Sequence, residues 1–127
     1  MVEFGVGVAI GIGVGYYFDH RTPTSPEGSD HASEISYVFG NLGGFGGSSG
    51  PDDKALSELM NSYWVNFAKN GDPNGPGLPV WPTFNEKEQK TMIFDKTSGP
   101  GPHPNLDQLK AFDAYYAKLR EEAKAKK

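Results

Sequence analysis

The sequence contains no cysteine, which excludes disulfide frameworks, thiolate nucleophiles and cysteine-ligated zinc. It is also short of positive charge, since 12 lysines and arginines stand against 16 aspartates and glutamates, for a formal net charge of −4. This balance offers no attraction to a nucleic-acid backbone or to an anionic membrane surface. We therefore expect neither a nucleic acid nor a membrane as a partner.

Apolar residues are scarce as well, at 36% of the chain. An average globular domain has roughly 45–50% when glycine is counted. The sequence is instead rich in 17 glycines and 10 prolines, which indicates that much of the chain forms loops. A length of 127 residues allows one small domain with a modest core.

The first part of the chain alternates with a period of two. Apolar side chains occupy the even positions from Val2 to Phe18, and glycine or alanine occupies the odd positions from 5 to 15. This pattern predicts a long β-strand, bent or broken at a glycine, with one apolar and one bare face. The run lacks a preceding lysine or arginine and a cleavage site, and a span would need about 20 residues. We expect a soluble protein without a signal peptide or membrane span, in a compartment that the sequence does not indicate.

Three polar or glycine-rich stretches predict loops. Residues 19–31 contain two prolines and a glycine that interrupt regular structure, so this stretch is expected at the surface. Residues 43–50 are mostly glycine and serine and have the composition of a flexible connection. Residues 98–104 are rich in glycine and proline and are also expected to form a loop. A short strand is expected at Thr91–Asp95.

Two stretches have the spacing of amphipathic helices. The first begins at Pro51, where two aspartates suit the positive end of the helix dipole, and ends near Gly71, a candidate left-handed cap. The second begins after Asn105 or Asp107 and runs into a charged tail, 121–127, that is expected to fray. The apolar residues that recur at spacings of three and four are Leu56, Leu59, Met60, Tyr63, Trp64 and Phe67 in the first helix, and Leu106, Leu109, Phe112, Tyr115, Tyr116 and Leu119 in the second.

The chain carries no metal or nucleotide motif. None of its three histidines stands four residues from another, so a helical zinc motif is absent, and neither a P-loop nor a complete G-x-G-x-x-G is present. Residues 46–50 match the G-x-S-x-G pattern, but a nucleophile elbow needs a strand directly before it, and the preceding glycines cannot form one. We therefore interpret Ser48 as a linker serine and expect no metal and no cofactor.

Four stretches together resemble a known family. They are Tyr16–Arg21, His31–Asn41, Tyr63–Asn74 and Leu78–Pro82. In this order and spacing they resemble the C-terminal segment of the type B carboxylesterases, which have the α/β-hydrolase fold. The resemblance implies a mixed α/β fold class, as a C-terminal remnant of that fold with strand material at the N-terminus, two main helices and a short strand. Residues 1–15 would lie outside the resemblance, as a strand or leader, and residues 16–127 would form the carboxylesterase segment.

The resemblance also implies one catalytic residue. His31 stands where the family has the general base of its Ser-His-Glu/Asp triad. Glu34 matches a glutamate that is not the triad acid, so a supporting role in ordering the loop is expected for it. Glycine often follows the histidine in the family, whereas this chain has Ala32. The nucleophile, the oxyanion hole and the triad acid lie upstream of this segment in the family.

Three hypotheses follow for the function. The first is an ester-hydrolase segment that is inactive alone and acts on a small-molecule ester only if another polypeptide completes it. The second is a self-associating structural protein, or a truncated fragment without catalysis, that forms a homo-oligomer through the N-terminal strand. The third is a minimal hydrolase in which His31 acts with Ser29, Ser33 or Ser48. We favour the first for biochemical identity and the second for physical behaviour, since the two are compatible.

Overall fold

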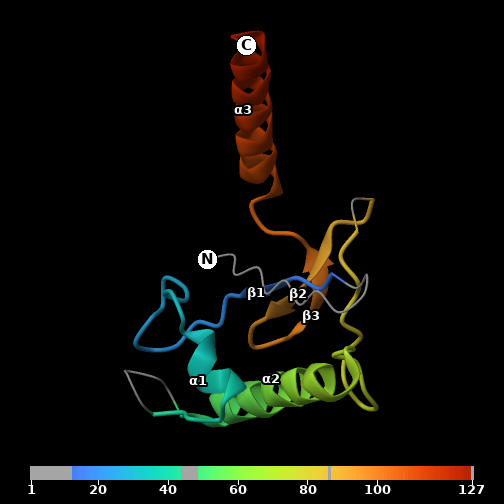
Figure 1. Cartoon of the computed structure of the whole chain (residues 1–127). Coiled ribbons are helices and arrows are strands. Elements are labelled where there is room, and N and C mark those ends of the chain that lie inside the picture. Colours follow the sequence, from blue (N-terminus) through green and yellow to red (C-terminus); the bar gives the residue numbers. More distant parts are fainter. Residues whose placement is uncertain (1–12, 44–48, 86, 127) are drawn as a thin grey trace.

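The computed structural model describes residues 13–43, 49–85 and 87–126 (Figure 1). Over these residues it combines short strands with helices of very different length. In chain order the elements are β1 (Tyr16–Phe18), α1 (Glu34–Val38), α2 (Pro51–Asn70), β2 (Lys90–Phe94), β3 (Gly99–Pro102) and α3 (Leu106–Ala125). The predicted mixed α/β class is confirmed. The N-terminal alternation is described only from Gly13 onward, so the prediction for residues 1–12 lies outside the described residues.

The strands form one sheet in the order β1-β2-β3. β1 runs parallel to β2, with Phe18 opposite Phe94, and β2 runs antiparallel to β3. Two parallel strands cannot be joined by a tight turn and need a long crossover. Here the crossover contains α1 and α2, which lie on one side of the sheet (Figure 1).

The core lies between α2 and the sheet. Met60 and Tyr63 of α2 and Phe94 of β2 have no exposed surface. The buried apolar residues are Phe18, Tyr37, Val38, Leu56, Met60, Tyr63, Trp81, Met92 and Phe94. The apolar spacing of residues 51–70 therefore predicts the buried face of α2 correctly, and Leu59 and Trp64 pack at the edge of the same core.

Both ends of α2 follow from local chemistry. Pro51 opens the helix, and the Asp53 carboxylate accepts the backbone N–H of Gly50 through Oδ2 at 2.8 Å. At the other end Gly71 has φ 71°, and its N–H donates to the carbonyl of Phe67 at 2.8 Å. This is the left-handed cap that the sequence predicts.

The prediction of a loop at residues 98–104 is wrong. β3 lies within this stretch and pairs with β2, with Gly101 opposite Thr91 and Gly99 opposite Ile93. A Cβ on Gly101 would lie 2.6 Å from Cδ1 of Ile93, so a larger residue here would require the end of the Ile93 side chain to move. Proline is tolerated because β3 is an edge strand. In this stretch, the glycine and proline content that would indicate a loop is found in an edge strand.

α3 is longer than predicted and stands apart from the core. The helix continues through the charged stretch to Ala125, where frayed structure is expected from the sequence. Ion pairs at helical spacing, Lys118 with Glu122 at 3.8 Å and Lys124 with Glu121 at 2.8 Å, stabilise this end. No residue of α3 is buried, and the helix projects away from the sheet and from α2 (Figure 1). None of the helices in the described ranges is long and apolar enough to span a membrane.

Candidate functional site

His31 lies in a turn between the loop that follows β1 and the first residue of α1. Its side chain is exposed. The turn is closed by two backbone hydrogen bonds, from Ser33 N–H to the Asp30 carbonyl at 3.2 Å and from Ile35 N–H to the Ala32 carbonyl at 3.3 Å. The loop character that the sequence predicts for His31 is thus confirmed, and α1 fixes the chain directly after it.

The residue after His31 has an unusual backbone conformation. Ala32 has φ 64°, in the left-handed region that favours glycine. An L-residue there costs roughly 1–2 kcal/mol. The structure therefore gives a physical reason for glycine at this position, and Ala32 occupies it under strain.

Glu34 lies three residues after His31 and differs from it in environment. It begins α1 and is buried, with 6% of its surface exposed. A carboxylate in the first turn of a helix is favoured by the helix dipole. The exposed imidazole and the buried carboxylate thus lie three residues apart in the chain, and a role of Glu34 in ordering the loop stays a prediction.

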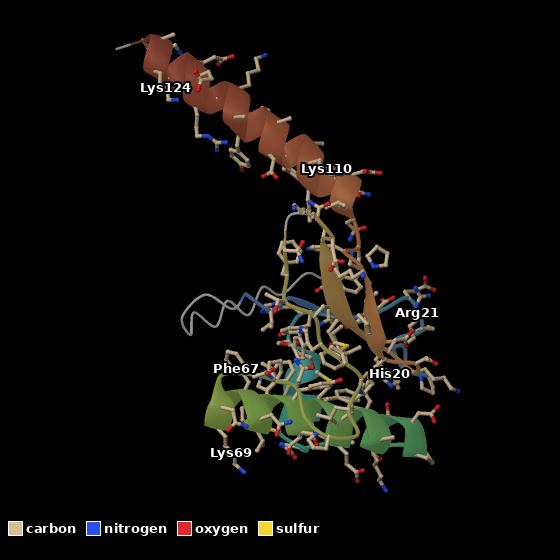
Figure 2. All side chains as sticks on the ribbon, turned by 90° about the vertical axis from the view of Figure 1, so that its right-hand side faces the viewer. His20, Arg21, Phe67, Lys69, Lys110 and Lys124 are labelled. Atoms are coloured by element: carbon tan, nitrogen blue, oxygen red, sulfur yellow. The ribbon has the colours of Figure 1, made fainter. Side chains whose placement is uncertain are left out.

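His20 is the residue that sequence reasoning missed. The stretch 19–31 is predicted to be a surface loop, but His20 is buried, with 5% of its surface exposed. The reason is a non-local partner, because His20 Nε2 lies 2.8 Å from Asp53 Oδ1 at the start of α2. Figure 2 shows His20 between the strands and α2. His20 therefore belongs to the interior, whereas Arg21 directly after it is exposed.

The Asp53 carboxylate is bound by donors from three segments. In addition to His20, the Tyr37 hydroxyl of α1 donates to Oδ1 at 2.9 Å, and the Gly50 N–H donates to Oδ2 at 2.8 Å. Burial, reinforced by the hydrogen bond to Asp53 and by its charge, raises the pKa of Tyr37 well above its usual value. Tyr37 therefore remains a proton donor to this carboxylate. Buried charges are stable when they are hydrogen-bonded in this way.

Two further polar side chains of α2 contact α1. The Ser57 hydroxyl donates to the Tyr37 carbonyl at 2.7 Å, and Asn61 Nδ2 donates to the Val38 carbonyl at 2.9 Å. Together with Asp53 these residues are spaced by four and lie on one face of α2, which we call the α2 polar stripe. In the sequence, this stripe can be recognised as polar residues spaced by four, next to the apolar residues that recur at helical spacing.

The serines considered as partners of His31 have other environments or lie outside the described residues. The Ser29 hydroxyl donates to the His20 carbonyl at 2.8 Å, so its proton is held by the backbone. The Ser33 carbonyl accepts the Ser36 hydroxyl at 3.1 Å, just before α1. Ser48 lies outside the described residues. Within the described ranges no group of three or more histidine, aspartate or glutamate residues could hold a metal ion.

Comparison with known proteins gives consistent results. The sequence model of the carboxylesterase family matches residues 15–111. Bovine carboxylesterase 4A is 42% identical over 91 residues, which are 68% of this chain and 16% of the relative. A PNB esterase structure superimposes with a TM-score of 0.66 at 30% identity and covers 75% of this chain and 20% of its own. A carboxylesterase structure from Geobacillus stearothermophilus gives a TM-score of 0.57 at 33% identity, over 70% of this chain and 19% of its own.

The fold and the matched structures define a partial α/β-hydrolase of the esterase type. This chain belongs to the carboxylesterase family. It spans 16% of the length of the bovine relative and 20% of the PNB esterase chain.

Proposed function

We propose that this chain supplies the general base, His31, of a carboxylic ester hydrolase and that it is inactive by itself. In the proposed reaction His31 accepts the proton of a serine hydroxyl while the serine oxygen bonds to the ester carbonyl carbon. The imidazolium returns the proton to the departing alkoxide as the carbon–oxygen bond breaks. Water then hydrolyses the acyl-enzyme through the same proton transfers. The serine, the oxyanion donors and the triad acid come from another polypeptide, and the substrate is a small-molecule ester.

The exposure of His31 beside a fixed helix is the observation that carries this proposal. A general base must reach a proton on another group, which a buried imidazole could not do across two polypeptides. The turn hydrogen bonds at Ser33 and Ile35 hold the backbone around it. His31 thus combines an accessible ring with an ordered support, as a base that completes a site in another polypeptide requires.

Exposed apolar side chains support a second polypeptide. Phe39 at the end of α1 is 75% exposed and Ile35 is 51% exposed, while Phe112 and Tyr115 of α3 are 60% and 57% exposed. Apolar surface of this kind marks places where another protein binds. In addition β1 pairs in parallel at one end of the strand order, and parallel sheets are normally covered on both sides.

Complementation tests the proposal. The chain would be mixed with a carboxylesterase relative from which the matching segment has been removed, and hydrolysis of a short-chain aryl ester would be followed. The mixture is expected to hydrolyse the ester, while the 127-residue chain alone is expected to give only the buffer rate. His31→Ala should reduce the rate of the mixture by about 10²–10⁴-fold, the usual contribution of a general base.

The matched control is Asp30→Asn, an exposed neighbour on the same turn, which should leave the rate unchanged. Full activity of the His31→Ala mixture would overturn the assignment of the base. Hydrolysis by the chain alone that disappears with His31→Ala would overturn the proposal that the chain is inactive by itself.

A second candidate function is self-association without catalysis, and the place of β1 at one end of the strand order favours it, because an edge strand can pair with a strand of another chain. The proposed contact is a homo-oligomer through the N-terminal strand. Light scattering at micromolar concentration should then give a dimer or larger species, and deletion of residues 2–12 should give a monomer. A monomeric full-length chain would contradict this candidate.

A further inference from the structure

The segment that carries His31 is attached at both ends to the same carboxylate oxygen. His20 precedes the loop and Tyr37 follows it in α1, and each lies within 2.9 Å of Asp53 Oδ1. Because both distances end on one atom, a displacement of Asp53 would move the entry and the exit of the loop together.

An additional contact ties the loop to the same anchor. The Ser29 hydroxyl donates to the His20 carbonyl at 2.8 Å. Ser29 is two residues before His31, so the backbone that leads into the His31 turn is attached to the residue that Asp53 holds. Two hydrogen bonds therefore connect Asp53 to the backbone before His31: one joins His20 to Asp53, and the other joins Ser29 to His20.

His20 depends on Asp53 for its side-chain hydrogen bonding. Its Nδ1 is buried and has no hydrogen-bond partner in the described part of the chain, with Asp95 Oδ1 at 3.7 Å. The hydrogen bond to Asp53 is therefore what orients the imidazole ring. A loss of this carboxylate would leave two buried ring nitrogens without a hydrogen bond and would release the ring.

We propose that Asp53 is the positioning residue for His31, acting through His20 on one side and Tyr37 on the other. This inference rests on the proposed function of His31 as the base. Asp53 touches neither the serine nor the ester and takes no proton in the reaction. Ser57 and Asn61, the remaining members of the α2 polar stripe, hold the α1 backbone that Tyr37 belongs to.

The first test measures hydrogen exchange in the chain alone, so it does not depend on ester hydrolysis. Asp53→Ala removes the oxygen that both His20 and Tyr37 contact, and it should speed the exchange of the Ser33, Ile35 and Phe39 amides by about tenfold or more, since opening of a local unit sets these rates. The Gly71 amide at the far end of α2 should keep its rate. Asp52→Ala is the matched control, because this neighbouring carboxylate is exposed and pairs with Lys96 at 3.0 Å.

The second test separates positioning from a general loss of structure. In the complemented mixture Asp53→Ala should lower kcat by about 10- to 100-fold, as displacement of a catalytic group by about 1 Å does, and leave KM within about twofold. Unchanged exchange and unchanged kcat would overturn the proposal. A rise in KM with constant kcat would overturn it as well, because Asp53 would then support binding instead of the base.

Tyr37→Phe keeps the proposal testable if Asp53→Ala does not fold. This variant removes one hydroxyl from Asp53 Oδ1 and keeps the ring in the core. Faster exchange confined to Ser33, Ile35 and Phe39 supports the inference, and an unchanged pattern overturns it. If the unmodified mixture hydrolyses no ester, the proposed function fails, while the exchange data still decide whether Asp53 holds the His31 segment.

Discussion

The Asp53 corner, which consists of Asp53 and the residues His20, Tyr37 and Gly50 that bind it, and α3 are ordered in opposite ways. At the corner, buried hydrogen bonds join residues far apart in the sequence, such as His20 with Asp53. α3 has 20 residues and none of them is buried, so its order comes from local pairs such as Lys124 with Glu121. The first region depends on tertiary structure and the second on helix propensity.

This difference determines which region can hold the proposed base in place. α1 has 5 residues, whereas helices shorter than about 12–15 residues are marginal in isolation. It is therefore helical because side chains of α2 bind its backbone carbonyls. The turn that contains His31 is ordered because it leads directly into α1. α3 is long enough to form with little help, but nothing in the described chain fixes its direction by burial.

The largest effect is expected from the core that supports the corner. Met60 on α2 has no exposed surface, so Met60→Ala should lower the free energy of unfolding by about 2–5 kcal/mol. The measurement is the urea unfolding midpoint. Leu119→Ala on α3, where the side chain is 40% exposed, is the matched control and should change it by less than about 1 kcal/mol. Equal losses from both variants would mean that α3 is packed in solution.

Alkaline pH is expected to weaken the corner next. The pKa of Tyr37 is raised in the folded chain, so folding holds its proton more tightly than the unfolded chain does. Its contribution to stability is therefore complete below the ordinary tyrosine pKa of about 10 and is lost as pH rises above that value. Tyr63, whose pKa burial raises to about 12, adds to the same loss.

The measurement is the urea midpoint at pH 8 and at pH 11. The midpoint of the unmodified chain should fall between these values, and Tyr37→Phe should reduce the fall without abolishing it, since Tyr63 remains. An equal fall in the variant would show that Tyr37 is already accessible to hydroxide in the folded chain.

A smaller effect, a gain in the free energy of unfolding, is expected at the turn that follows His31. Ala32→Gly relieves a left-handed conformation and should raise stability by about 0.5–1 kcal/mol, the steric gain less the extra entropy of glycine. Ala55→Gly on the exposed side of α2 is the opposite control and should lower stability by about 1 kcal/mol. A loss of stability in both variants would contradict the strain assigned to Ala32.

The smallest effect is expected from removal of α3. A chain that ends at Asn105 should unfold within about 0.5 kcal/mol of the full chain, because no residue of α3 belongs to the buried core. Its circular dichroism should lose the helical signal of those residues. A large drop in the urea midpoint would show that α3 shares the core of the corner.

Local patterns in the sequence predict some elements well. Pro51 and Gly71 mark the two ends of α2, because the backbone preferences of proline and glycine act locally and do not depend on distant residues. β2 is observed at Lys90–Phe94, one residue earlier than the Thr91–Asp95 predicted from its apolar run. The position of His31 in a loop follows from the prolines and glycine before it.

Non-local contacts account for what the sequence does not predict. β3 forms by pairing with β2, with Gly101 opposite Thr91, and this pairing cannot be seen in a glycine and proline run taken alone. His20 is buried by an aspartate 33 residues away. Its neighbours in the chain are polar, so local composition places it at the surface.

The prolines of β3 disfavour the addition of a further strand at the β3 edge of the sheet. The His103 N–H donates inward to the Gln89 carbonyl at 3.0 Å, so alternation along the strand turns the nitrogens of Pro102 and Pro100 outward. Neither nitrogen carries a hydrogen, and a further strand would find no donor at these two positions. A polypeptide that extends this sheet would therefore add beside β1, close to the end that leads to His31, and aggregation through the β3 side is discouraged by the same two residues.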